Sequence, residues 1–161
     1  MSERRQRVPR TTSPTVDPAA SPAHETTFND NVVAASFAPD LESVSAARAF
    51  VAAQTGLAGR SQHDAALVTS ELATNAVIHA STSFEVCVRT GCDRICIAVA
   101  DRSSHIPELE PEKPAVTATS GRGLRIVAQL ADRWGIEPSR TGKTIWAELR
   151  VSSRDRVGFS V

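Results

Sequence analysis

Two polar residues lie one helical turn apart near the middle of the sequence. Glu71 and Asn75 lie four residues apart in a stretch with the apolar periodicity of an amphipathic helix. The stripe expected to face the core consists of Ala65, Val68, Leu72 and Ala76. Asn75 lies about 20° and Glu71 about 60° from the direction of Val68, within or beside that stripe. An unpaired polar group there costs on the order of 1 to 3 kcal/mol, so the pair indicates either a hydrogen-bonded helix edge or a polar ligand pocket.

The two side chains have the chemistry of a phosphate site. Asn75 offers a neutral oxygen that suits Mg²⁺, an ion that keeps several waters and takes most of its other ligands from phosphate. Glu71, one turn earlier, can accept a proton from a hydroxyl group or a water. A pocket on this side of the helix would combine a metal ligand with a general base.

Three further segments hold residues that suit a nucleotide. Asp101 ends an apolar segment at the mouth of the expected sheet, although Asp also commonly starts turns. Gly121, Arg122 and Gly123 precede a helical pattern, where glycine permits close backbone approach and the first N–H groups of the helix can receive phosphate. A helix-entry turn explains these glycines equally well. Residues 142–144, taken alone, are explained by the end of a hairpin turn.

The rest of the sequence predicts the elements that must position these residues. Helices are expected from Asp40 to Gly56, from a cap at Ser61 to about residue 80, and after Gly123. Strands are expected over 32–37, 82–90, 94–101, 134–137 and 143–151. Residues 102–120 have no periodicity, as in a functional lid or a disordered loop. This order predicts an α+β fold, a two-layer sandwich with a mixed, mostly antiparallel sheet and helices on one face.

Length and charge limit the chain to one small domain. Residues 1–30, with four prolines among Ser, Thr and Ala, predict a disordered tail. Residues 31–152 are expected to form the domain, and residues 153–161 a short C-terminal tail.

The charges of the sequence balance. Lys plus Arg and Asp plus Glu number 18 each, so no net charge favours binding to nucleic acid or membrane. With no signal-peptide pattern and no long apolar run, we expect a cytoplasmic protein whose partners are a small ligand or other proteins.

The three cysteines, Cys87, Cys92 and Cys96, are not expected to bind metal. Their number is odd and no second Cys or His pair has zinc-ligand spacing. They are expected to be reduced, small apolar residues on or between two strands. The absence of tyrosine also argues against a platform for single-stranded nucleic acid.

In order and spacing, the polar segments together resemble the N, G1, G2 and G3 boxes of the GHKL, or Bergerat-fold, ATPases. The four matches are Glu71-Leu-Ala-Thr-Asn75 with His79, Val-Ala-Asp101 before Pro107, Gly121-Arg-Gly-Leu124, and Gly142-Lys-Thr144-Ile-Trp. The pattern is most similar to that of the anti-sigma-factor serine/threonine protein kinases and their short actinobacterial relatives. The resemblance covers about residues 31–151.

This resemblance implies a role for each matched position. Asn75 is expected to coordinate the Mg²⁺ that bridges the phosphates of ATP, and Glu71 to act as general base. Asp101 is expected to accept a hydrogen bond from the adenine amino group, with Thr144 close by. The hinge between the lid and the third helix is expected to consist of Gly121, Arg122, Gly123 and Leu124.

The G1 segment departs from the family pattern. Where members often have Asp-x-Gly-x-Gly, residues 101–107 read Asp-Arg-Ser-Ser-His-Ile-Pro. Missing glycines restrict the backbone close to the base, which is expected to affect nucleotide affinity and lid closure. Short relatives tolerate this pattern, so nucleotide binding itself is expected to survive. His79 belongs to the N box and is not expected to be a phospho-accepting histidine, since there is no room for the helical domain that presents one.

The resemblance implies a kinase that transfers the γ-phosphoryl group of ATP to a hydroxyl group on a small antagonist protein and otherwise sequesters a sigma factor. The alternative is a nucleotide-dependent protein-binding module with little or no turnover, which the glycine-poor G1 segment favours and the presence of Glu71 disfavours. An ATPase motor is not expected, because no transducer domain follows the last strand. Exposed positions of the first helix are compatible with a homodimer.

Overall fold

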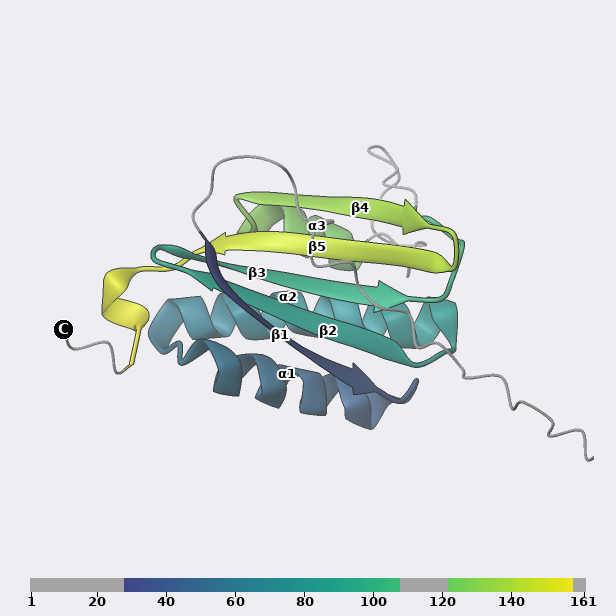
Figure 1. Ribbon diagram of the computed structural model, residues 1–161, viewed down its shortest axis with the longest axis horizontal. Helices are drawn as coiled ribbons and strands as arrows, with labels where there is room; N and C mark the ends of the chain where they lie inside the picture. Colours follow the sequence, from purple (N-terminus) through teal and green to yellow (C-terminus); the bar gives the residue numbers. More distant parts are fainter. Residues whose placement is uncertain (1–27, 108–121, 158–161) are drawn as a thin grey trace, which may run out of the picture.

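The computed structural model describes residues 28–107 and 122–157 (Figure 1). Within these residues the elements follow one another in the predicted order. They are β1 (Phe28–Phe37), α1 (Leu41–Thr55), α2 (Gly59–Ala80), β2 (Phe84–Gly91), β3 (Arg94–Asp101), α3 (Arg122–Leu130), β4 (Arg133–Ser139), β5 (Gly142–Arg150) and a short 3₁₀ turn, η1 (Ser153–Asp155). Most of the expected tail (1–27) and most of the expected lid (108–120) lie outside the described residues.

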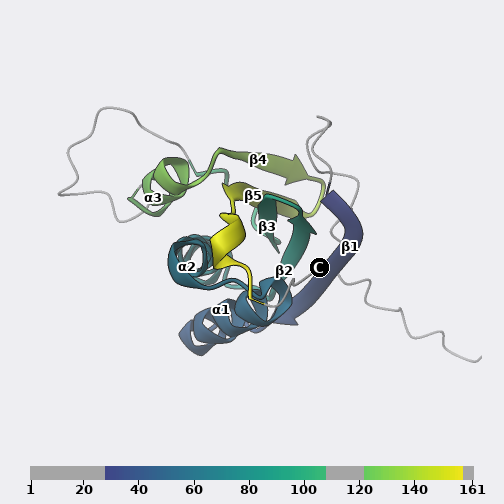
Figure 2. The ribbon, with the colours of Figure 1, turned by 90° about the vertical axis from the view of Figure 1, so that its left-hand side faces the viewer.

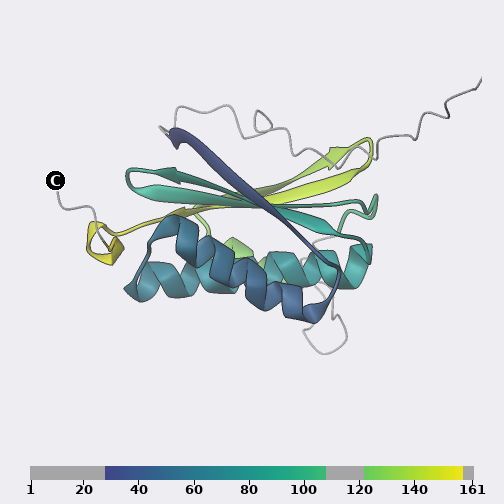
Figure 3. The ribbon, with the colours of Figure 1, turned by 60° about the horizontal axis from the view of Figure 1, so that its bottom comes forward.

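The five described strands form one sheet in the order β1-β2-β3-β5-β4, and each neighbouring pair is antiparallel. The central position of β3 explains why its sequence is apolar on both faces. All three described helices lie on the same face of the sheet, so the molecule has two layers (Figures 2 and 3). The predicted α+β sandwich is confirmed.

The core lies between α2 and the middle of the sheet. The four residues of the predicted stripe are buried, with exposures of 3% for Ala65, 0% for Val68 and 1% for both Leu72 and Ala76. They belong to the same apolar cluster as Ile95, Ile97 and Val99 of β3 and Ile145, Ala147 and Leu149 of β5. Burial of each large apolar side chain contributes about 1.5 to 3 kcal/mol, and it fixes which side of α2 faces the sheet.

Local signals set the bounds of α1 as predicted. The Asp40 side chain accepts a hydrogen bond from the backbone N–H of Ser43 at 2.7 Å, as an N-cap residue does. At the other end, Gly56 takes a left-handed conformation with φ of 57° and its N–H donates to the carbonyl of Ala52.

The predicted cap of α2 is wrong. The helix begins at Gly59 and Ser61 lies inside its first turn. The N-cap residue is Ala58, whose side chain makes no capping hydrogen bond, and Asp155 caps the helix in its place: its Oδ2 accepts from the Ser61 backbone N–H at 3.0 Å and from the Ser61 hydroxyl at 2.8 Å. A capping residue 94 positions away in the sequence leaves no signal near the helix, whereas a serine close to the helix start resembles a local cap.

The same C-terminal segment fastens the α1–α2 connection. The backbone N–H of Ala58 donates to the Asp155 carbonyl, Leu57 forms an isolated bridge with Arg156, and the Arg156 guanidinium donates to the carbonyl of Gly91. Figure 3 shows this segment beside the start of α2. Residues 153–157 therefore pack on the domain. No helix among the described residues is long and apolar enough to span a membrane.

Asp155→Asn is expected to lower the melting temperature by a few degrees at pH 7, because α2 loses its charged cap. The hydrogen bonds from Ser61 lower the pKa of Asp155 below its ordinary value of 3.8. A lowered folded-state pKa means that this stabilisation is present above pH 3.8 and is lost as the pH falls through the folded pKa. The difference in melting temperature between the two proteins, followed by circular dichroism, should therefore shrink below about pH 4.

Glu42→Gln is the matched control, because Glu42 is an exposed carboxylate in the first turn of α1 that is not its cap. Equal melting temperatures for Asp155→Asn and the unchanged protein at pH 7 would contradict the capping role.

Candidate functional site

Asp101, at the end of β3, forms a buried ion pair with Lys143, the second residue of β5. The two residues are register partners across the strands. The Lys143 Nζ lies 3.0 Å from Oδ1 and 2.9 Å from Oδ2 of Asp101, and both side chains are only 2% exposed. A buried charge needs such a partner, because desolvation without one is costly. The pair joins the G1 and G3 segments.

Gly142 makes this approach of the two strands possible. A Cβ atom added to it would collide with the backbone carbonyl oxygen of Asp101 and would lie 2.7 Å from the Cα of Arg102. Both obstacles are backbone atoms, which cannot move aside as a side chain can. The position therefore requires glycine for close approach.

Glu71 lies against the start of α3. A Cβ atom added to Gly123, in the first turn of α3, would lie 2.6 Å from Glu71 Oε2. The absence of a side chain at Gly123 is thus what leaves space for the Glu71 carboxylate. This contact joins the N and G2 segments. The next residue, Leu124, is only 2% exposed and packs α3 against the core.

Asn75 lies one turn after Glu71 on α2, and both residues are partly exposed, as expected of positions beside the buried stripe. Further along the helix, the His79 ring lies 6.2 Å from the ring of His105, between centroids. His105 follows Asp101 by four residues, so this contact brings the helix that carries Asn75 to the G1 segment.

The contacts place the four predicted segments at neighbouring positions. Glu71 meets Gly123, His79 meets His105, and Asp101 meets Lys143. In Figure 1, β3 ends and β5 begins on the same side of the sheet, which is also where α2 ends. Of the hinge residues, Arg122 is exposed at the first position of α3 and Gly121 lies outside the described residues.

Thr144 lies on the opposite face of the sheet from Asp101. Successive strand residues point to opposite faces, and Lys143 shares its face with Ile145 of the core. Thr144 therefore faces away from the helices, together with its register partners Ala100 and Glu137. The residue of β5 that reaches Asp101 is Lys143, which the sequence reasoning did not select.

The described cysteines are free, and two of them are buried in β2 and β3. Burial raises the pKa of the Cys96 thiol to about 12, with a further contribution from the charge of Glu148. Burial likewise raises the pKa of Cys87, with the neighbouring Glu85 adding to it. Both thiols are therefore protonated and poorly nucleophilic at neutral pH, in agreement with the expected structural role.

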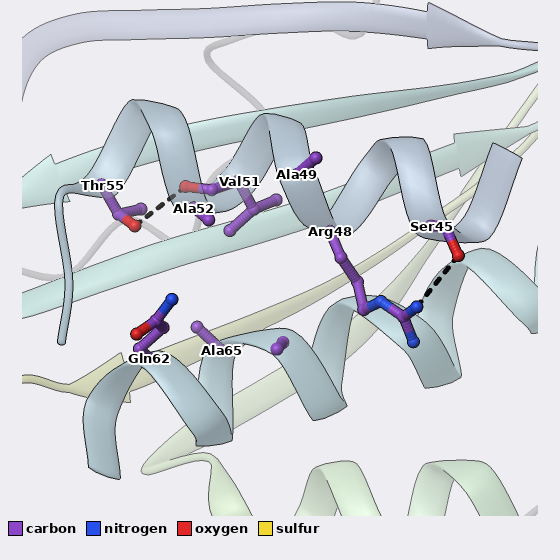
Figure 4. Close-up of a pocket in the computed structure, with 9 residues that line it drawn as sticks. Ser45, Arg48, Ala49, Val51, Ala52, Thr55, Gln62 and Ala65 are labelled. Atoms are coloured by element: carbon purple, nitrogen blue, oxygen red, sulfur yellow. Dashed lines mark hydrogen bonds between the residues drawn. The ribbon is translucent and has the colours of Figure 1, made fainter. Parts of the chain in front are cut away.

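A separate hollow of about 310 Å³ lies between α1 and α2 (Figure 4). Small side chains such as Ala49, Ala52 and Ala66 line it, and Arg48 extends into it with hydrogen bonds to the hydroxyl groups of Ser45 and Ser70. None of the predicted site residues lines this hollow.

The donor set of the described residues fits Mg²⁺ only as an ion shared with phosphate. No group of three or more His, Cys, Asp or Glu side chains in the described part of the chain could hold a metal ion by itself. Mg²⁺ commonly takes one or two protein oxygens and completes its octahedron with water and phosphate. The amide of Asn75 suits that role.

The chain matches the sequence model of a known protein family. Residues 37–149 match the sequence model of the histidine kinase-like ATPase domain. No curated protein is similar enough to the chain to be counted as a match. The matched range spans more than two thirds of the chain and includes both residues of the Asp101–Lys143 pair.

Gly142→Ala is expected to destabilise the fold by on the order of 2 to 4 kcal/mol, because the added methyl group meets backbone atoms of Asp101 and Arg102. Denaturant unfolding followed by tryptophan fluorescence measures this. Thr141→Ala, an exposed change one residue earlier, should stay within about 0.5 kcal/mol of the unchanged protein. Equal unfolding midpoints for the two variants would show that β5 can begin without glycine.

Proposed function

Because this chain belongs to the histidine kinase-like ATPase family and so carries an ATP-binding domain, we propose that it is a regulatory serine/threonine protein kinase of the anti-sigma-factor type. The observation that carries the proposal is the placement of Glu71 against Gly123 at the start of α3. It puts a carboxylate beside a glycine at a helix N-terminus, a place where phosphate groups are readily bound. A sigma factor and a small antagonist protein are the proposed partners, on the resemblance of the motifs.

The two ends of the nucleotide would meet different residues. Asp101, with both carboxylate oxygens buried beside Lys143, would receive the adenine amino group. The phosphates would lie towards the N-terminal turn of α3, near Gly123 and Glu71. Asn75 would hold Mg²⁺, which when bound neutralises charge that develops on the phosphate oxygens.

Phosphoryl transfer needs little covalent chemistry from the protein beyond positioning and proton removal. In the proposed reaction, the hydroxyl oxygen of a Ser or Thr on the antagonist forms a bond to the γ-phosphorus of ATP. The bond between that phosphorus and the β–γ bridging oxygen breaks, and ADP leaves. The hydroxyl proton passes to the Glu71 carboxylate. Gly123 supports this role because it leaves the Glu71 carboxylate uncovered by a side chain on α3.

A nucleotide-dependent binding module with little turnover is the second candidate. The observation that favours it is that the protein itself already uses most of the hydrogen-bonding capacity of the Asp101 carboxylate: Oδ1 accepts from the Ser103 backbone N–H at 2.8 Å as well as from Lys143. Because this carboxylate already has hydrogen-bond partners within the protein, a bound nucleotide can form fewer new hydrogen bonds with it. Turnover is what separates the two candidates.

Asn75→Ala is expected to weaken binding of ATP in the presence of Mg²⁺ by at least about tenfold, through loss of a metal ligand. Isothermal titration of ATP with and without Mg²⁺ measures it. Binding to Asn75→Ala should also lose its dependence on Mg²⁺. Gln129→Ala, an exposed amide on α3, is the matched control and should bind as the unchanged protein does. Normal Mg²⁺ dependence in Asn75→Ala would rule out this pose of the nucleotide.

Glu71→Gln is expected to bind ATP within about threefold of the unchanged protein but to transfer phosphate about 10² to 10⁴ times more slowly, because the amide cannot accept the proton. Transfer is measured with γ-labelled ATP and a panel of purified candidate antagonists, and hydrolysis with ATP alone. Equal transfer by both proteins would remove Glu71 as the base. If the unchanged protein binds ATP but shows no detectable transfer or hydrolysis, the second candidate function is favoured.

A further inference from the structure

Lys143 has no role in the motif pattern, yet its ammonium group is among the most deeply buried charges of the described residues. Its two contacts with Asp101 are short, at 2.9 and 3.0 Å, and each side chain is 2% exposed. The pair lies at the end of the sheet where the G1 and G3 segments meet. A lysine that only filled space there would be replaced at lower cost by an apolar side chain.

The hydrogen bonds within the protein determine how many acceptor positions of the Asp101 carboxylate remain for a ligand. An ionised carboxylate accepts about four hydrogen bonds and donates none. Oδ1 accepts from the Ser103 backbone N–H and from Lys143, and Oδ2 accepts from Lys143. One acceptor position therefore remains on Oδ2, and no donor.

We propose that Lys143 determines which base the site selects. By holding Asp101 as an oriented carboxylate with one acceptor position left, it makes the site favour a purine with an amino group at carbon 6 over a purine with an oxygen there. The inference rests on the proposed function, in which Asp101 meets the base. It adds Lys143 as a residue that acts on selectivity through Asp101, in the place that Thr144 was expected to take.

The physical reason is the orientation of the Asp101 carboxylate. Two short contacts from the Lys143 ammonium group hold both of its oxygens in place. A carboxylate oxygen fixed towards carbon 6 accepts from an amino group there and repels the oxygen of a 6-oxopurine. Without these contacts the carboxylate can turn and accept from the protonated N1 of a 6-oxopurine instead, so the preference between the two bases falls.

The test compares ATP with inosine triphosphate (ITP). The base of ITP has an oxygen in place of the amino group at carbon 6, and its N1 carries a hydrogen. Affinities of both nucleotides are measured with Mg²⁺ by isothermal titration for the unchanged protein, Lys143→Met and Lys143→Arg. The unchanged protein should bind ATP at least about tenfold more tightly than ITP. In Lys143→Met the ratio should fall to within about threefold, and Lys143→Arg, which keeps the charge, should restore it.

Arg140→Met is the matched control, because it removes an exposed cation in the turn between β4 and β5 and should leave the ratio unchanged. Circular dichroism and melting temperature show whether each variant is folded. If Lys143→Met does not fold, Lys143→Gln takes its place, since its amide still donates to Asp101 but carries no charge; its ratio should fall below that of Lys143→Arg.

Three results would overturn the inference, and they are distinguishable. An unchanged protein that binds ATP and ITP equally means that the Asp101–Lys143 pair does not select the base. An equal loss of affinity for both nucleotides in a folded, uncharged Lys143 variant means that the lysine only supports the structure; in both cases the proposed ATP site stands. Binding of neither nucleotide to the unchanged protein removes the proposed function and the inference together.

Discussion

The rotation of α2 about its own axis is the constraint on which the arrangement of the site depends. Val68, Leu72 and Ala76 are almost fully buried against the sheet, and a helix has only one orientation that buries all of them. That orientation places Glu71 and Asn75 at the border of the buried stripe, where they are partly exposed. A turn of α2 large enough to bury the two polar groups would expose the apolar ones, so the free energy of core packing also fixes the polar residues of the site.

A second constraint acts on the sheet, at the ends of β3 and β5. The two strands approach so closely there that Gly142 has no space for a side chain, and the next residue, Lys143, faces the helices with Asp101. A shift of one residue in the register would bring Thr144 to that face and expel the lysine. Because the buried ion pair is stable only when both charges face each other, the pairing of β3 with β5 and the chemistry of the site depend on the same register.

Most of the fold was predictable because its signals are local. The order of the elements, the bounds of α1 with Asp40 and Gly56, and the buried stripe of α2 all follow from periodicity and capping residues near them in the sequence. The errors concern contacts between distant residues. Asp155 caps α2 from 94 positions away, and Lys143 rather than Thr144 reaches Asp101, because the face of a strand residue depends on a register that no single segment encodes. The alternation that buries Ile145 was the one signal that could have identified Lys143.

The glycine-poor G1 segment is explained by the same carboxylate. Glycine is needed where the backbone has a positive φ, and among the described non-glycine residues only Ser81 has one, so residues 102–107 do not use that conformation. Instead, the Ser103 N–H donates to Asp101 Oδ1 and the Ser103 hydroxyl accepts from the N–H of His105, two short-range bonds typical of Asp and Ser in turns. Asp101 thus shapes the chain that follows β3 while Lys143 holds both of its oxygens. Loss of the glycines therefore does not by itself remove a nucleotide site; it makes the shape of the G1 segment depend on the carboxylate that is proposed to meet the base.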